Sequence, residues 1–340
     1  MPLDLRALPK VQLHCHLEGT VRAERFRELA AQHGVDIGER GRGPLEHTYR
    51  FADFAEFLLL FRDVCEVLRT PDDYAKLAAD YAADAAAQGV RYAEVFVSPS
   101  VWTWFHREID VRATFAAMRG ALDDAQRAHG IAVAFICDLT RNFGPERALK
   151  TAHLAASLRE FGVIGVGLGG DEVRMPPEHF AEAFATARAA GLRTVAHAGE
   201  AAGAPSVRAA VEVLGAERIG HGVRALEDPA TVALLVERRI ALEVCPTSNF
   251  LTGAAPRGAP HPAGALDAAG VIVTIDADDP ALFGCSLLDE YAYVADTFGE
   301  DVLLRFAGNA IDASFASPVV RERLHAELEA SRNSALAVEA

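Results

Sequence analysis

The sequence predicts an α/β protein, a (β/α)8 TIM barrel, because short apolar stretches alternate with amphipathic helical segments along the whole chain. Eight such units in 340 residues fit a closed barrel of parallel strands. The glycine-rich phosphate turn that is typical of a doubly wound sheet does not follow the first stretch. We therefore expect a single barrel domain over residues 1–340. The eight predicted strands are residues 11–16, 91–97, 131–139, 163–168, 193–199, 218–222, 240–246 and 271–277.

The segments between these strands carry apolar residues at the period of a helix, and several end at glycine. YAKLAADYAADAAAQG and ATFAAMRGALDDAQRAHG are two examples. Residues 20–90, between the first and second strands, are too many for one crossover helix. Their helix formers and aromatic residues predict extra helices inserted after the first strand, over the barrel mouth.

Composition narrows the classes of function. The chain is 51% hydrophobic and carries 33 Lys and Arg against 48 Asp and Glu, a formal charge of -15. Such a surface repels nucleic acid and anionic lipid, so we expect a small-molecule substrate. We expect a cytoplasmic protein, because no leader and no apolar run of about 18 residues is present. The five cysteines are scattered and are expected to be reduced thiols, and the oligomeric state is left open.

The first predicted strand contains two histidines one residue apart, in VQLHCHLEG at residues 11–19. Successive side chains of a strand alternate, so His14 and His16 face one side while Cys15 faces the surrounding helices. Taken alone, this pair is as compatible with hydrogen-bonded core histidines as with a metal site.

Other strands end in similar residues. His197 ends the fifth strand, His221 ends the sixth, and Asp278 and Asp279 follow the eighth. The carboxyl ends of barrel strands converge on one cavity, so these side chains are expected to meet the histidine pair. Three imidazoles and a carboxylate with an open position suit Zn²⁺, and iron or manganese accept the same ligand set. The sequence therefore predicts a metal site.

As a set, these motifs resemble the adenosine deaminase family of the amidohydrolase superfamily, which includes adenosine, adenine and 6-aminodeoxyfutalosine deaminases. They are HCH at 14–16, HAGE at 197–200, GHG at 220–222 and DDP at 278–280. The resemblance runs from Pro9 to about Phe315. It implies hydrolytic removal of the exocyclic amine of a purine nucleoside, with Glu200 and His221 as catalytic residues. The metal ligands it implies, for one Zn²⁺ per chain, are His14, His16, His197 and Asp278.

The chemistry of these roles follows from general principles. Bound Zn²⁺ lowers the pKa of its water from about 15.7 to about 7, which makes hydroxide available. Attack at C6 pushes negative charge onto the ring nitrogen N1, so a protonated carboxyl there lowers the barrier, and Glu200 matches that position in the family. His221 is expected to orient the water, and Asp279 to hydrogen-bond it and contact the substrate.

Structural alternatives stand beside these roles. Glu200 also suits the first turn of a helix, and Asp279 before Pro280 suits a helix start. Gly170 matches the family glycine whose backbone contacts the purine N3, and it equally suits a turn.

Two departures bear on the substrate. Glu18 and Gly167 stand where relatives acting on adenosine usually carry Asp. Glu18 resembles relatives that act on adenine or on 5′-extended nucleosides such as 6-aminodeoxyfutalosine, an intermediate of menaquinone synthesis. Its alternation with the histidine pair places it beside the bound nucleoside.

Two further features after the predicted strands are ambiguous. An aromatic loop, Trp102 to Phe105 with Trp104 within it, is placed to cover an aryl tail, and Arg141 to meet a carboxylate. Packing and a solvated surface charge explain them equally well.

Three alternatives to a nucleoside deaminase remain. A two-metal amidohydrolase carries a bridging carboxylated lysine after the fourth strand, but residues 163–173 contain no lysine, which predicts a mononuclear site. A catalytically silent purine-binding barrel is disfavoured because every expected ligand and Glu200 are present. Deamination of free adenine is the third alternative.

Overall fold

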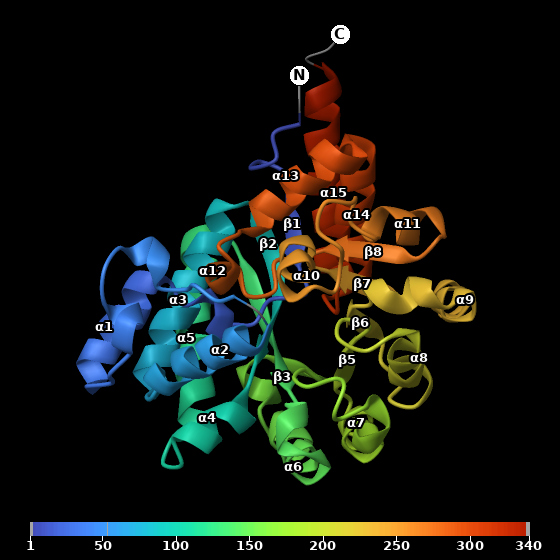
Figure 1. Cartoon of the computed structure of the whole chain (residues 1–340). Helices are drawn as coiled ribbons and strands as arrows, with labels where there is room; N and C mark the ends of the chain where they lie inside the picture. Colours follow the sequence, from blue (N-terminus) through green and yellow to red (C-terminus); the bar gives the residue numbers. More distant parts are fainter. Residues whose placement is uncertain (1–2, 53, 338–340) are drawn as a thin grey trace.

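The computed structural model describes residues 3–52 and 54–337, and it confirms the predicted barrel (Figure 1). Eight strands pair in parallel with their sequence neighbours, in the order β1 to β8. The strands are β1 Lys10–Gln12, β2 Val90–Val97, β3 Ala132–Asp138, β4 Val163–Gly167, β5 Arg193–Ala198, β6 Arg218–His221, β7 Ala241–Val244 and β8 Ile272–Ile275.

The first strand is shorter than predicted, and the reason lies in a side chain. Asp276 Oδ1 accepts hydrogen bonds from the backbone N–H groups of Leu13 (2.6 Å) and His14 (3.0 Å), which therefore leave the sheet ladder. Beyond this point the chain pairs again, as His16 N donates to Asp278 O (2.9 Å) and Asp278 N to His14 O (3.1 Å). This contact brings the predicted histidine pair against the carboxyl end of β8.

Helices surround the strands on the outside of the barrel (Figure 1). They are α1 Ala23–His33, α2 Phe54–Val67, α3 Pro71–Ala87, α4 Pro99–Phe105, α5 Val111–His129, α6 Pro145–Ser157, α7 Ala181–Ala189, α8 Ala204–Glu212, α9 Pro229–Arg238, α10 Pro246–Thr252, α11 Ala263–Ala268, α12 Pro280–Phe283, α13 Leu287–Phe298, α14 Glu300–Ala313 and α15 Pro318–Ala337. Short 3₁₀ helices are η1 Glu18–Thr20, η2 Gly38–Gly41, η3 Leu45–His47, η4 Arg141–Phe143, η5 Arg159–Phe161, η6 Pro177–Phe180 and η7 Val223–Glu227.

The segment between β1 and β2 contains α1 and α2 in addition to the crossover helix α3, as the length of this segment predicts. A capping box starts α3, since the Thr70 side chain accepts from Asp73 N while the Asp73 carboxylate accepts from Thr70 N, a motif that stabilises a helix start by about 1 kcal/mol. Phe57 and Phe61 of α2 line the cavity at the barrel mouth. Of the inserted helices, α2 therefore contributes directly to the cavity wall.

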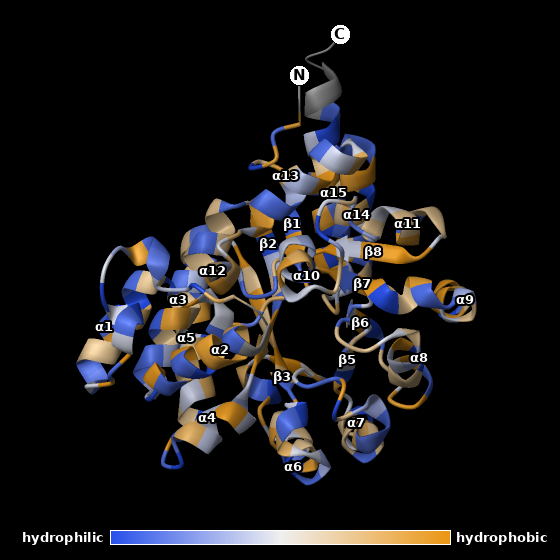
Figure 2. Ribbon diagram, in the orientation of Figure 1, coloured by the Kyte–Doolittle hydropathy of each residue, from blue (hydrophilic) through white to orange (hydrophobic). Residues whose placement is uncertain are grey.

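Most of the chain's apolar residues are buried between strands and helices, and Figure 2 shows hydrophobic residues along the strands. Inside the barrel, Phe96, Ile136 and Val195 form a small separate cluster. Beside it, the buried Arg218 guanidinium bonds Glu94 (2.6 Å) and Glu243 (2.5 Å). Among the described helices, none is both long enough and apolar enough to cross a membrane.

Candidate active site

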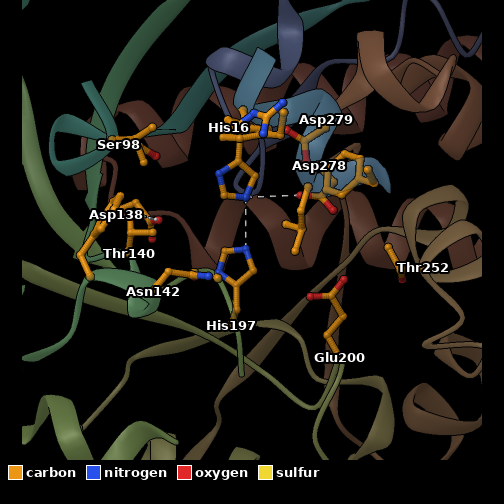
Figure 3. A pocket seen from close by; sticks show the side chains of 18 of the residues that line it. His16, Ser98, Asp138, Thr140, Asn142, His197, Glu200, Thr252, Asp278 and Asp279 are labelled. Carbon is orange, nitrogen blue, oxygen red and sulfur yellow. Dashed lines mark hydrogen bonds and ion pairs between the residues drawn. The ribbon is translucent and has the colours of Figure 1, made fainter. Parts of the chain in front are cut away.

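A cavity of about 330 Å³ opens at the carboxyl ends of the strands, within the size range of small-molecule sites. Its walls differ in chemistry. The polar lining residues labelled in Figure 3 are His16, Ser98, Asp138, Thr140, Asn142, His197, Glu200, Thr252, Asp278 and Asp279, and Arg62 and His221 line the cavity as well. The apolar lining includes Phe57, Leu58, Phe61, Val101, Trp104, Phe105, Phe143 and Phe283.

The predicted histidines and carboxylates meet at one side of this cavity. His16 Nε2 lies 3.1 Å from His197 Nε2, and His14 Nε2 and His16 Nε2 each lie 3.4 Å from Asp278 Oδ1. Within residues 3–52 and 54–337, two groups of side chains have ligand atoms close enough to hold a metal ion. They are His14, His197, His221 and Asp278, and His16, Asp278 and Asp279.

Hydrogen bonding at the rings suits a divalent cation. His14 Nδ1 donates to Glu243 Oε2 (2.8 Å), so the lone pair of its Nε2 faces the cluster, where this buried nitrogen has no hydrogen-bond partner among the described residues. At 3.1 Å, at most one of the facing nitrogens of His16 and His197 can carry hydrogen. Burial lowers the pKa of His16 to about 4, which keeps its ring neutral. The donor set therefore fits Zn²⁺ or a similar ion.

Asp278 is held in place from both sides. Its backbone adopts a φ of 60°, rare for a residue other than glycine and frequent at functional sites. Ser248 Oγ donates to Asp278 Oδ2 (2.6 Å). Burial raises the pKa of Asp278, but the surrounding histidines, His14 first, outweigh burial and hold the pKa well below its usual range. Asp278 is thus ionised and available to a cation.

A chain of hydrogen bonds fixes the tautomer of His221. The Ala263 backbone N–H must donate, so His261 Nδ1 accepts (3.1 Å) and its Nε2 carries the hydrogen. That Nε2 donates to Asn249 Oδ1 (3.2 Å), which turns the Asn249 amide nitrogen toward His221 Nδ1 (3.0 Å). Burial lowers the pKa of His261 to about 3, so its ring stays neutral.

It follows that His221 Nδ1 accepts and that its hydrogen is on Nε2. This Nε2 lies 3.6 Å from Glu200 Oε2 and 4.0 Å from Asp278 Oδ2. A nitrogen that carries hydrogen cannot bind a metal. Of the candidate ligands, His221 is therefore better suited to donate a hydrogen bond into the cluster.

Glu200 follows β5, and its carboxylate points into the cavity (Figure 3). Helix α8 begins only at Ala204, so Glu200 is not in a first helical turn, which removes the structural alternative. Burial is the largest influence on Glu200 and raises its pKa, which favours the proton-bearing form that a general acid needs.

Asp279 does precede α12, but its side chain makes no capping hydrogen bond, and it lines the cavity. Its Oδ1 has no hydrogen-bond partner in the described part of the chain. Burial and the neighbouring charge of Asp278 raise the pKa of Asp279 well above its usual value. Asp279 is thus available to a bound molecule.

The two glycines singled out in the sequence, Gly170 and Gly167, have different surroundings. Gly170 lines the cavity with a φ of 96°, so both the turn and the proposed substrate contact suit it. At Gly167, an added Cβ would lie 2.4 Å from Phe96 Cε1. The ring of Phe96 therefore occupies the space that a side chain at residue 167 would need.

The prediction for Glu18 rested on an extended chain, and that premise is wrong. The chain turns into the 3₁₀ helix η1 at Glu18, so the alternation from His14 and His16 does not reach it. The Glu18 carboxylate is fully buried, and its Oε1 accepts from Ser98 N (3.0 Å) and Trp102 Nε1 (2.6 Å). Glu18 is not one of the residues that line the cavity, so its carboxylate lies behind the cavity wall.

The aromatic segment and Arg141 also differ from expectation. Residues 99–105 form helix α4 rather than a loop, with Trp102 buried and Trp104 exposed at the cavity. Arg141 is buried, so neither the solvated charge nor the carboxylate contact describes it. Its guanidinium donates to Met175 O and His197 O, both at 2.6 Å, and so it holds the β5 end in place.

Several polar residues of the site were missed from the sequence. They are Glu172, Glu243, Asn249 and His261, together with the cavity residue Asp138. A charged residue inside an apolar strand, as in IALEVCP, is the signal that could have found Glu243.

A parallel eight-stranded barrel with a histidine and aspartate cluster at the carboxyl ends of its strands has the architecture of a metal-dependent hydrolase. The family model described as Adenosine deaminase matches residues 9–331. The chain belongs to this family of hydrolytic deaminases within the amidohydrolase superfamily.

Similar proteins carry two different names. An aminodeoxyfutalosine deaminase of Streptomyces avermitilis is 39% identical, over 96% of this chain and 91% of that protein. An adenine deaminase of Streptomyces coelicolor is also 39% identical, over 97% and 98%.

Solved structures are similar over nearly the whole chain. An adenine deaminase from Arthrobacter aurescens has a TM-score of 0.88 at 32% identity, covering 95% of this chain and 98% of its own. An amidohydrolase from Burkholderia ambifaria with bound Zn has a TM-score of 0.87 at 29% identity, covering 98% and 94%.

Proposed function

We propose that this chain is a zinc-dependent deaminase that hydrolyses the 6-amino group of an adenine nucleoside extended at its 5′ end, as in 6-aminodeoxyfutalosine, and releases ammonia. The observation that carries the reaction is the position of Glu200, a partly buried carboxyl that faces His221 Nε2 beside the histidine and Asp278 cluster. An acid and a cation site then act on neighbouring atoms of one purine ring.

The residues divide the work as follows. His14, His16, His197 and Asp278 would hold one Zn²⁺. When bound, the ion supplies a water with a pKa of about 7. Glu200 delivers its proton to purine N1, where negative charge develops. His221 directs its Nε2 hydrogen toward the attacking oxygen. Asp279 lies beside that oxygen and accepts or returns a proton. The backbone of Gly170 contacts the purine N3.

The apolar wall supports an extended substrate. Trp104 and Leu58 line the cavity and are 58% and 39% exposed, although large apolar side chains are usually buried. An aryl or alkyl group on the nucleoside would cover them. The relative named aminodeoxyfutalosine deaminase supports the same choice.

Free adenine is the second candidate, since relatives of equal similarity are named adenine deaminase. The two candidates differ in whether a sugar enters the cavity, and so kinetics can separate them.

The test measures ammonia release from adenine, adenosine and 6-aminodeoxyfutalosine, together with the metal content of the purified protein. We expect about one equivalent of zinc, inferred from the four-ligand set, and the highest kcat/KM for the extended nucleoside. His16→Ala should lose metal and activity, whereas the control His129→Ala, at an exposed helix end, should keep both.

Two tightly bound equivalents would contradict the mononuclear site. A preference for adenine would favour the free-base alternative. Purine binding without ammonia release would mean a catalytically silent barrel.

A further inference from the structure

Asp138 is a buried carboxylate on the cavity wall that the proposed reaction does not use. It ends β3, is only 4% exposed, and lines the cavity. Figure 3 shows it beside Ser98, Thr140 and Asn142, across the cavity from Glu200 and Asp278. The cavity therefore has a second polar region away from the histidine cluster.

The carboxylate of Asp138 is poorly satisfied. Its Oδ1 has no hydrogen-bond partner among the described residues, and Oδ2 accepts a long bond of 3.4 Å from Thr140 Oγ1, with the Gly169 backbone beside the carboxylate. The nearest cation in the sequence, Arg141, directs its guanidinium to two backbone carbonyls instead. A buried carboxylate without strong partners destabilises the protein unless a ligand supplies them.

The pKa of Asp138 agrees with these sparse contacts. Burial raises the pKa of Asp138 to about 6, although the Gly169 backbone and the Arg141 charge act to lower it. A hydrogen-bond donor from a bound molecule would offset that burial.

The chemistry of a purine indicates which donor reaches this wall. C6 and N9 lie on opposite sides of the bicyclic ring, so a purine with C6 at the histidine cluster directs its N9 substituent away from it. The turn at Gly169 and Gly170 adjoins Asp138, since a Cβ on Gly169 would lie 3.1 Å from Asp138 Oδ2. A ribose on N9 presents hydroxyl donors toward this region, whereas free adenine presents one N–H.

We propose that Asp138 is a specificity-determining residue that accepts a hydrogen bond from a ribose hydroxyl of the substrate, so that the enzyme selects nucleosides over the free base. The inference rests on the proposed function and adds the residue that reads the sugar. Ser98 and Thr140 border the same region, and the Thr140 hydroxyl also lies 3.0 Å from Ser100 Oγ.

The test compares kcat/KM for adenosine and 2′,3′-dideoxyadenosine in the parent protein and in Asp138→Asn. Hydrogen bonds to a charged group are worth roughly 10- to 150-fold in an equilibrium, so the parent should prefer adenosine by about 10²-fold. In Asp138→Asn, kcat/KM should fall for adenosine but not for 2′,3′-dideoxyadenosine, so most of that preference should be lost. The zinc content should not change. The control Glu178→Gln, an exposed residue outside the cavity, should keep the parent preference.

Equal losses for both substrates in Asp138→Asn would overturn the inference, as would a parent that does not distinguish them. A fall in kcat/KM for free adenine as large as the fall for adenosine would show that Asp138 does not act through the sugar, and would overturn the sugar contact. If Asp138→Asn does not fold, Asp138→Ala and the parent's response to 2′-deoxyadenosine and 3′-deoxyadenosine decide. A parent that releases ammonia from no adenine compound would instead refute the proposed function, and the sugar contact with it.

Discussion

The carboxylate of Glu172 lies against the backbone of Glu200, whose N–H donates to Glu172 Oε2 over 3.2 Å. The same carboxylate accepts from the N–H groups of Gly199 (2.6 Å), Ala201 (2.8 Å) and Ala202 (2.8 Å). Four consecutive backbone donors thus converge on one side chain. Glu172 thereby fixes the loop that carries the acid.

Glu172→Gln should lower kcat by about 10²-fold, because an amide presents N–H donors to these N–H groups and displaces Glu200 by a fraction of an ångström to an ångström. KM and zinc content should change little, since Glu172 lines neither the cavity nor the metal site. Steady-state kinetics and metal analysis measure this, with the exposed Glu182→Gln as control. An unchanged kcat, or a loss explained by lost zinc, would contradict the positioning role.

Glu200→Gln should lower turnover by about 10² or more, because the amide keeps the shape but cannot deliver a proton. Zinc content should stay the same. Near-normal turnover with full zinc would show that Glu200 is not the acid.

The pH dependence of the parent follows from the same residue. The active form of Glu200 is the protonated one, and burial raises its pKa. Activity that depends on Glu200 is therefore retained at low pH and lost as pH rises through that raised pKa. We expect a basic limb in the kcat/KM profile of the parent that is absent from Glu200→Gln.

Asn249→Asp should move the hydrogen of His221 from Nε2 to Nδ1, because a carboxylate must accept where the Asn249 amide donates (3.0 Å). Activity should fall by at least about 10²-fold, as expected when a catalytic histidine adopts the wrong tautomer. Nitrogen NMR of labelled histidine reads the tautomer directly, apart from activity. An Nε2-bound hydrogen in this variant would refute the hydrogen-bond chain, and Asn333→Asp, on the exposed face of α15, is the control.

Glu18→Asp should shift specificity through Trp102 rather than by touching the substrate. The shorter side chain withdraws from Trp102 Nε1, and an unsatisfied buried indole costs about 1–3 kcal/mol. We expect a lower Tm, and a kcat/KM ratio moved from the extended nucleoside toward adenosine as α4, which carries Trp104, shifts. Zinc content should not change. Unchanged Tm and ratio would rule out this route, and Glu39→Asp, on the surface, is the matched control.

Sequence patterns predicted the barrel and the cluster because both depend on which residues form each strand and which residues stand at its carboxyl end. Apolar stretches of strand length mark the strands, and carboxyl ends of parallel strands converge wherever the intervening chain goes. His14, His197 and Asp278 could therefore be placed together from their positions at strand ends alone. The early end of β1 could not be predicted, since it depends on the carboxylate of Asp276, far along the chain.

Only the tertiary structure decided the partners of the side chains. Glu172 meets Glu200 across 28 residues, and Glu18 meets Trp102 across 84. Arg141 satisfies backbone carbonyls, whereas Asp138 is left with an unpaired oxygen at the cavity. A sequence pattern gives the residue types and their spacing along an element. Hydrogen bonding and burial depend instead on which atoms the folded chain brings within about 3 Å of one another.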